Sequence, residues 1–331
     1  MTRAWSLFFV ALLACGGSNP QPATPLPEPV PADAAPAPPP PPPPPPQPQP
    51  LDLPIATPQT SLKLVKPGTG KKAVLKLALA TGSKQHVELA LDFSGKQMAP
   101  PQFGGNTEDV APTLVLPADI EIGDVGSDGN AKWKLTVASV DARDRAGSKT
   151  SIDKFKEQMQ GIVGLVISGS VGADGKLGDL AIHLDKADKT ALNAVALVKL
   201  SLMPMWPQLP ADAIGVGAKW TVTNPFKIAD KLDTTATADF ELVSHKGNQW
   251  VINAKTKLTG TDFKADEHTS FQKIGGTGSV AMTLTDGAAV PQSASTLASD
   301  FTAVLVGGPG GGSDAQSAQF HLEQGFAVTP K

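Results

Sequence analysis

Proline is distributed very unevenly along the chain, and this distribution limits which part of it can fold. The 331-residue sequence holds 32 prolines, of which 20 lie between Pro20 and Pro58, and nine of these are consecutive, Pro38 to Pro46. Proline fixes φ and has no backbone N–H, so such a stretch does not form a helix or the interior of a sheet. The sequence therefore predicts a disordered tether over residues 15–58 and a globular domain over residues 59–331.

The proline-rich tether is expected to be long and semi-rigid. At ~3.1 Å per residue in the polyproline II conformation, its roughly 40 residues extend up to roughly 120 Å. We interpret it as a spacer that holds the domain away from a membrane. The alternative is a ligand for a proline-recognition module.

Charge and cysteine content exclude several classes of protein. The chain has one cysteine, which excludes an internal disulfide framework and a cysteine-rich zinc site. Its formal net charge of −3 gives no basic footprint for nucleic acid. The residues after the tether are enough for one large domain or two coupled lobes.

The first 14 residues are typical of a signal peptide. Arg3 precedes the apolar run Leu7 to Ala14, and small residues follow it. Eight helical residues rise only about 12 Å, far short of the ~30 Å hydrocarbon core of a membrane. We therefore expect export and not a spanning helix.

The end of this run, Leu12-Leu13-Ala14-Cys15-Gly16, resembles a bacterial lipobox. The resemblance implies that Cys15 is acylated, for example with palmitate, and becomes the N-terminus after cleavage. Several acyl chains together hold a protein stably at a membrane. Gly16 departs from the inner-membrane retention signal, which implies the outer membrane, with the domain in the periplasm. The alternative is an ordinary signal peptide with a chance cysteine.

Alternation of apolar and polar residues dominates the domain. In the stretch His86 to Phe93 every second residue is apolar, which indicates a half-buried antiparallel strand. We expect the segment 74–80 to pair with it across the turn 81–84. Glycine beside aspartate or asparagine predicts further hairpin turns, at Ser127–Asn130, Ala173–Lys176, Lys246–Asn248 and Asp286-Gly287.

Two segments show helical spacing instead. Ser151 is expected to cap a short helix that carries Ile152, Phe155 and Met159 on one face. The segment 190–203 predicts a second helix, apolar nearly all round and therefore buried on a sheet. We expect an α+β, mainly β fold: a large curved antiparallel sheet, half-barrel-like, with one or two packed helices.

The segment from Gly169 through the Asp174-Gly175-Lys176-Leu177 turn to Gly217-Ala218-Lys219-Trp220 resembles a family of uncharacterised bacterial lipoproteins that carry a domain of unknown function. The resemblance covers roughly residues 62–263, and the family brings no activity or catalytic residues. The expected layout is also similar to the half-barrels of lipid-binding lipoproteins and lipoprotein carriers. That similarity concerns architecture, and fold alone does not settle function.

No local motif predicts catalysis, a metal site or a cofactor. The five histidines are all more than five residues apart, and His86 and His183 stand in alternating stretches that place them on solvated faces. Gly311-Gly312-Ser313 lies in a glycine run too flexible for a nucleophile elbow. Asp174 and Asp179 do not have the spacing of a calcium loop. We therefore expect a protein that is not an enzyme and has no cofactor.

The sequence around Met203-Pro204-Met205-Trp206-Pro207 is its most unusual apolar cluster. Methionine adapts to varied apolar partners. A possible apolar pocket is therefore assigned to Leu202, Met203, Met205 and Trp206. The alternative is the end of a helix inserted into the core.

Two functions remain from the sequence. The first is a membrane-anchored, non-enzymatic envelope lipoprotein that binds a lipid or another apolar ligand. The second is a structural or interaction module that contacts a protein or cell-wall partner in the periplasm. The two differ in whether the concave side of the sheet is open or filled.

Overall fold

The computed structural model describes residues 49–55, 57, 59–101, 104–187, 191–192, 195, 205–228, 232–306 and 315–331. The chain divides into two units, Met1–Pro48 and Gln49–Lys331, and the fold described below is that of the second. The predicted signal peptide, Cys15 and most of the predicted tether lie outside the described residues.

Within the described residues the second unit is built mostly from antiparallel strands, and its helical elements with defined bounds are the short helix α2 (Ile152–Met159) and a 3₁₀ turn (Gln160–Ile162). In chain order the strands are β1 (Gln49–Ile55), β2 (Ser61–Lys66), β3 (Thr69–Val74), β4 (Lys84–Met98), β5 (Thr107–Val110), β6 (Thr113–Val125), β7 (Ala131–Val137), β8 (Asp141–Arg143), β9 (Val166–Val171), β10 (Leu177–Ala187), β11 (Ala213–Val216), β12 (Lys219–Ile228), β13 (Leu232–Lys246), β14 (Gln249–Gly260), β15 (Phe263–Lys264), β16 (Thr269–Thr285), β17 (Gln292–Leu305) and β18 (Gln316–Pro330).

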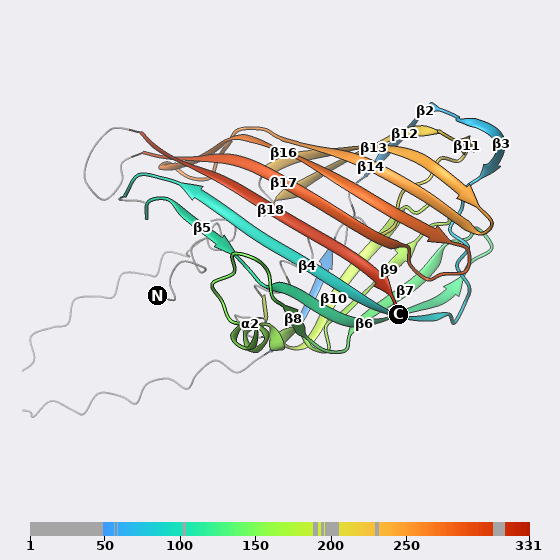
Figure 1. The fold of residues 1–331 in the computed structure, drawn as a ribbon, viewed down its shortest axis with the longest axis horizontal. Helices are drawn as coiled ribbons and strands as arrows, with labels where there is room; N and C mark the ends of the chain where they lie inside the picture. The colour runs from blue at the N-terminus through green and yellow to red at the C-terminus, as the bar shows by residue number, and fades with distance from the viewer. Residues whose placement is uncertain are drawn as a thin grey trace, which may run out of the picture. The chain divides into compact units, whose positions relative to one another are not determined.

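One large sheet joins most of these strands in the order β1-β10-β9-β7-β6-β4-β18-β17-β16-β14-β13-β12-β2 (Figure 1). Its two edges, β1 and β2, are consecutive in sequence. Six residue steps separate Ile55 from Ser61, and a chain spans at most about 3.6 Å per step, or roughly 20 Å in all. The sheet must therefore curve until its edges approach, yet it is not closed. The predicted mainly β fold with a large curved antiparallel sheet is confirmed.

The start of the folded unit differs from the expected boundary. Residues 49–55 form β1 and pair with β10, from Gln49 opposite Ala187 to Ile55 opposite Leu180, whereas the predicted tether extends to Pro58. Proline is tolerated here because β1 is an edge strand, where the missing N–H can face away from the partner. Strand β1 therefore lies within the segment that proline density assigns to the tether.

The predicted turns are confirmed, but one predicted hairpin is wrong. The four glycine turns join β6 to β7, β9 to β10, β13 to β14 and β16 to β17, and their glycines have positive φ. Val74 ends β3, which pairs with β11 and not with β4. Strand β4 pairs instead with β6 and β18, the last strand of the chain. Alternation identified β4 correctly but could not identify its distant partners.

The two helical segments have different outcomes. The helix predicted after Ser151 is confirmed as α2, with Phe155 and Met159 buried, but the Ser151 side chain makes no capping hydrogen bond. Of the predicted helix 190–203, Ala191, Leu192 and Val195 are described and are helical. Its other residues lie outside the described part. No helix within the described residues is long and apolar enough to cross a membrane.

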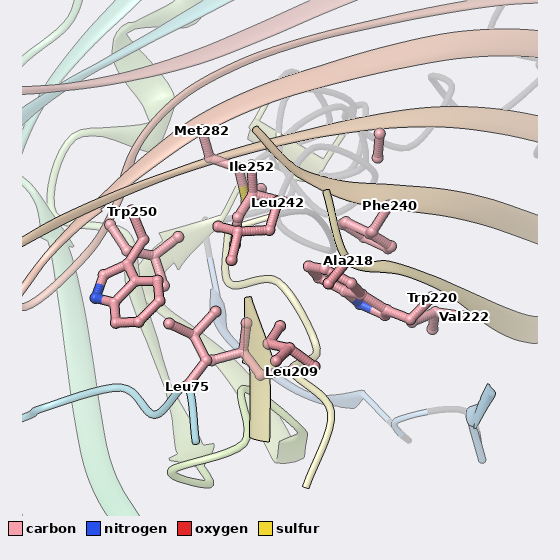
Figure 2. Packing of buried hydrophobic residues seen from close by; sticks show 13 residues of the cluster. Leu75, Leu209, Ala218, Trp220, Val222, Phe240, Leu242, Trp250, Ile252 and Met282 are labelled. Atoms are coloured by element: carbon pink, nitrogen blue, oxygen red, sulfur yellow. The ribbon is translucent and has the colours of Figure 1, made fainter. Parts of the chain in front are cut away.

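One hydrophobic cluster fills the inner face of the sheet beside its β2 edge (Figure 2). Trp220 on β12 stacks against Phe240 on β13, with ring centroids 5.4 Å apart. Leu75 and Leu209, from segments outside the large sheet, pack against side chains carried by its strands. This part of the concave side is therefore filled by the protein's own side chains. The remaining members are Ile214, Ala218, Val222, Leu242, Trp250, Ile252, Ala254, Met282 and Leu284.

Candidate functional site

The inner face of the sheet, defined as the side that carries the buried core residues, is not equally buried along its length. On β18, Phe326 and Val328 are buried, but Phe320 and Leu322 further along the same face are half-buried. The neighbouring strands show the same change. We call the half-buried stretch the distal inner face, and it comprises Phe93, Phe271, Leu297, Phe301, Phe320 and Leu322.

Three phenylalanines on adjacent strands form a row at the centre of the distal inner face. Phe301 on β17 and Phe320 on β18 are register partners, and their rings stack with centroids 4.8 Å apart and planes 11° apart. Phe271 on β16 meets Phe301 edge to face at 6.0 Å. Such pairs hold aromatic side chains in fixed positions. The row is a preformed apolar surface.

Small residues lie beside this row of phenylalanines on the inner face. Ser299 lies opposite Gly276 on one side and Leu322 on the other. A Cβ at Gly276 would come within 2.5 Å of the carbonyl oxygen of Ala298, so the backbones approach too closely for a larger residue. Gly278, two positions along β16, is equally restricted. Beside the phenylalanine row the inner face therefore carries only small residues at Ser299, Gly276 and Gly278.

The side chain of Asn224, on the inner face, has an oxygen without a hydrogen-bond partner among the described residues. Asn224 on β12 continues the row that runs through Ala236, Leu258, Gly276 and on to Ser299. Its side-chain Oδ1 is buried and accepts no hydrogen bond. A buried acceptor without a donor is costly, on the order of 1–3 kcal/mol. This atom is placed to accept a hydrogen bond from a hydroxyl, amide or protonated carboxyl group.

A groove of about 870 Å³ crosses the opposite, outer face of β12, β13, β14, β16 and β17. Its lining includes polar outer-face side chains from each of these strands. These are largely satisfied by one another: Lys219 Nζ lies 3.4 Å from Glu241, and the Thr221 hydroxyl donates to Asp239 at 2.7 Å. A groove whose polar groups already pair with each other gives a ligand little to bind, so we regard it as the weaker candidate.

The pocket predicted around the methionine cluster falls partly outside the described residues, because Leu202 and Met203 are among those left out. Met205 and Trp206 are both buried. The Trp206 indole lies 4.9 Å from that of Trp133, and its Nε1 donates to the carbonyl of Ala289 at 3.3 Å. These two side chains therefore belong to the core and do not line the distal inner face.

The histidines lie apart and pair mostly with carboxylates. His86 pairs with Asp119, and His183 contacts Asp52 and Asp185 at 2.7 and 3.0 Å. His245 stacks on the ring of Trp250. Both His86 and His183 lie on the solvent face, as the alternation predicts. Among the residues that the structure describes, no group of three or more His, Cys, Asp or Glu side chains has an arrangement that could hold a metal ion.

The most connected histidine is His321, on the outer face of β18. Its Nδ1 lies 2.8 Å from Asp300, and its Nε2 lies 3.4 Å from Glu323. The hydrogen bond to Asp300 raises the pKa of His321, with a smaller contribution from Glu323. The hydroxyl of Ser94 donates to Glu323, and this bond and His321 lower the pKa of Glu323. Because Ser94 bonds to Glu323 and not to His321, the group lacks the serine–histidine pair of a nucleophile.

This network makes stability depend on pH. A raised histidine pKa stabilises the fold below the unfolded value of 6.5, and that contribution is lost as pH rises through the folded pKa. The lowered pKa of Glu323 stabilises the fold above the unfolded value of 4.5, and this contribution is lost as pH falls through the folded pKa. We expect the substitution His321→Gln to lower the urea midpoint of unfolding by more at about pH 5.5 than at about pH 8.5. An equal difference at both values would contradict this.

Two further sequence features have clear structural outcomes. Asp174 Oδ1 accepts from the backbone N–H of Lys176 at 3.0 Å, which is the turn geometry expected of this Asp-Gly pair. The glycine run with Ser313 lies outside the described residues, between the paired strands β17 and β18.

Sequence reasoning missed the row of phenylalanines. The period-two positions of Leu297, Ser299 and Phe301 were the available signal.

Comparisons with known proteins add no family. No family model and no curated protein matches the chain. A solved structure of OmpT, an in-vitro folded outer membrane protein of Vibrio cholerae in a trimer form, is 7% identical and covers 75% of this chain and 100% of its own, with a TM-score of 0.17. The outer membrane protease OmpT of Escherichia coli is 9% identical, covers 75% and 96%, and has a TM-score of 0.15. Likenesses this weak carry no argument about fold or function.

Proposed function

We propose that this protein is a membrane-anchored envelope lipoprotein whose domain binds an extended apolar ligand, such as an acyl chain, on the distal inner face. The observation that carries the proposal is the half-buried row of Phe271, Phe301 and Phe320 on a face that is otherwise filled. The role is binding, without a reaction or a cofactor.

The chemistry of the face suits a ligand with a chain and one polar group. Burial of apolar surface of the ligand and of the protein stabilises such a complex by about 25 cal/mol per Å². A narrow chain could lie along the small residues Ser299 and Gly276, with Asn224 Oδ1 as an acceptor at the end of that row. Apolar walls with few polar groups are typical of small-molecule sites.

A fluorescent fatty acid tests the site. The full chain with Cys15→Ser, which removes the proposed acylation site, is titrated with the probe. We expect saturable binding that Ser299→Trp weakens by at least about tenfold, because a bulky indole replaces a small side chain beside the phenylalanine row. Thermal unfolding of the variant checks that the fold is retained.

Thr296→Trp is the matched control. Thr296 lies on the same strand, β17, but is exposed on the outer face. The substitution Thr296→Trp should leave the affinity for the probe within about twofold of the parent, since a surface substitution away from the site has little effect. An absence of probe binding by the parent, or equal losses in both variants, would count against the ligand site.

The anchor is a separate part of the proposal and is supported by the lipobox-like sequence before Cys15. In bacteria that express the full chain, we expect a clickable palmitate analogue to label the protein and Cys15→Ser to remove the label. The protein should then shift from the outer-membrane fraction to the soluble periplasmic fraction. Labelling that persists in the variant would refute acylation at this cysteine.

The second candidate function is a structural or interaction module that contacts a protein or cell-wall partner in the periplasm. The core cluster favours it, because the inner face beside Trp220 and Trp250 is filled. The two functions predict different results in the fatty-acid titration. A chain that folds normally and binds no probe would support the module.

A further inference from the structure

Lysines are concentrated in one exposed segment of a chain that is slightly acidic overall. Residues 61–76, here called the basic segment, span β2, β3 and the two residues after β3. No aspartate or glutamate occurs from Leu53 to Val87. All the lysines of the segment are exposed, and they are Lys63, Lys66, Lys71, Lys72 and Lys76.

These lysines are unpaired among the residues that the structure describes, because no carboxylate lies within ion-pair distance of any of them. The acids nearest by strand register are already engaged: Glu241 pairs with Lys219, and Asp239 accepts from Thr221. Asp212, just before β11, is exposed. Several lysines elsewhere on the sheet are paired, for example Lys84 and Lys134, which both contact Glu121. The positive charge here is therefore uncompensated locally.

Apolar side chains stand exposed among the lysines. Val65 on β2 is 61% exposed and Val74 on β3 is 46% exposed. Val216 on β11, which pairs with β3, is 43% exposed, and Leu62 on β2 is also exposed. The strands β2, β3 and β11 lie together at one end of the unit (Figure 1). Both faces of β2 and β3 are largely exposed, and Val65 also lines the outer-face groove.

We propose that the basic segment docks the domain onto an anionic lipid membrane. Lysines near an anionic surface are attracted to its headgroups, and exposed apolar side chains among them insert at the interface. Exposed valines among the lysines favour a membrane interface, because it accommodates both positive charge and apolar side chains. This contact is independent of Cys15 and of the distal inner face.

Co-sedimentation with lipid vesicles tests the proposal, again with the full chain carrying Cys15→Ser. One set of vesicles is phosphatidylcholine alone, and the other is two parts phosphatidylcholine to one part phosphatidylglycerol. We expect about tenfold stronger binding to the anionic vesicles. That binding should be lost at about 1 M salt, where the Debye length falls to about 3 Å.

Charge reversal locates the contact. The triple variant Lys63→Glu, Lys71→Glu, Lys72→Glu should lose about tenfold in binding to anionic vesicles. The control triple Lys132→Glu, Lys154→Glu, Lys257→Glu changes net charge equally, at exposed lysines elsewhere, and should change binding by less than about twofold. Val65→Ser with Val74→Ser should weaken binding with the lysines intact. Unfolding midpoints confirm that each variant folds.

Three outcomes would overturn the proposal. The first is equal binding to neutral and anionic vesicles. The second is an equal loss in the two lysine triples. The third is binding to soluble polyglutamate with no binding to vesicles, which would assign the segment to an acidic protein partner. A failed fatty-acid titration would leave this surface unaffected, because the two sites share no residues.

Discussion

Replacing Trp220 with alanine is expected to lower the free energy of unfolding by about 3–5 kcal/mol. Trp220 is 1% exposed and stacks on Phe240 in the core cluster. Its Nε1 also donates to the backbone carbonyl of Gln208 at 2.8 Å. The substitution therefore leaves a cavity and removes the donor for that carbonyl. Urea unfolding followed by tryptophan fluorescence and circular dichroism measures the loss.

Trp220→Phe separates the two contributions. The phenyl ring keeps much of the contact with Phe240 but loses the hydrogen bond to Gln208, so we expect a smaller loss of about 1–3 kcal/mol. Val243→Ala, at a largely exposed position on β13, should change stability by less than about 0.5 kcal/mol. A Trp220→Ala loss as small as that of Val243→Ala would show that this cluster is not the stabilising core.

The second large effect is expected at the turn between β9 and β10. Gly175 has φ +77°, and a Cβ there would lie 1.9 Å from the carbonyl oxygen of Pro207. The backbone N–H of Leu209 donates to Asp174 O at 2.8 Å in the same contact. Gly175→Ala should therefore cost about 2–4 kcal/mol, from left-handed backbone strain together with displacement of the segment around Pro207.

Gly287→Ala is the matched control for Gly175→Ala. Gly287 also has positive φ, at +83°, in the turn between β16 and β17, but no atom lies within 4 Å of the position of its Cβ. Gly287→Ala should lower the free energy of unfolding only by the cost of left-handed backbone strain, about 1–2 kcal/mol. Equal losses at the two glycines in urea unfolding would show that the contact with Pro207 does not contribute.

Local features of the fold could be predicted from the sequence because local chemistry determines them. The alternation from His86 to Phe93 predicts β4, and glycine beside aspartate predicts the turn at Gly175. The helix that carries Phe155 follows from three- and four-residue spacing. These patterns depend on neighbours in sequence, so one sequence is enough to find them.

Long-range features could not be predicted in the same way. Strand β4 pairs with β18, more than two hundred residues later, and no local pattern specifies that partner. The row of Phe271, Phe301 and Phe320 also depends on the register between strands, because single phenylalanines in alternating segments look like ordinary core residues. Pro50 and Pro54 indicate a tether until the edge position of β1 is known.

Photo-crosslinking tests the central claim, that the distal inner face binds an acyl chain, most directly. A fatty acid that carries a diazirine on its chain is irradiated with the full chain bearing Cys15→Ser, and the modified peptides are identified by mass spectrometry. The account predicts crosslinks on β17 and β18 at or beside Phe301, Phe320 and Leu322, reduced by unlabelled fatty acid. Crosslinks confined to outer-face residues such as Lys255, or no crosslink that unlabelled fatty acid reduces, would contradict it.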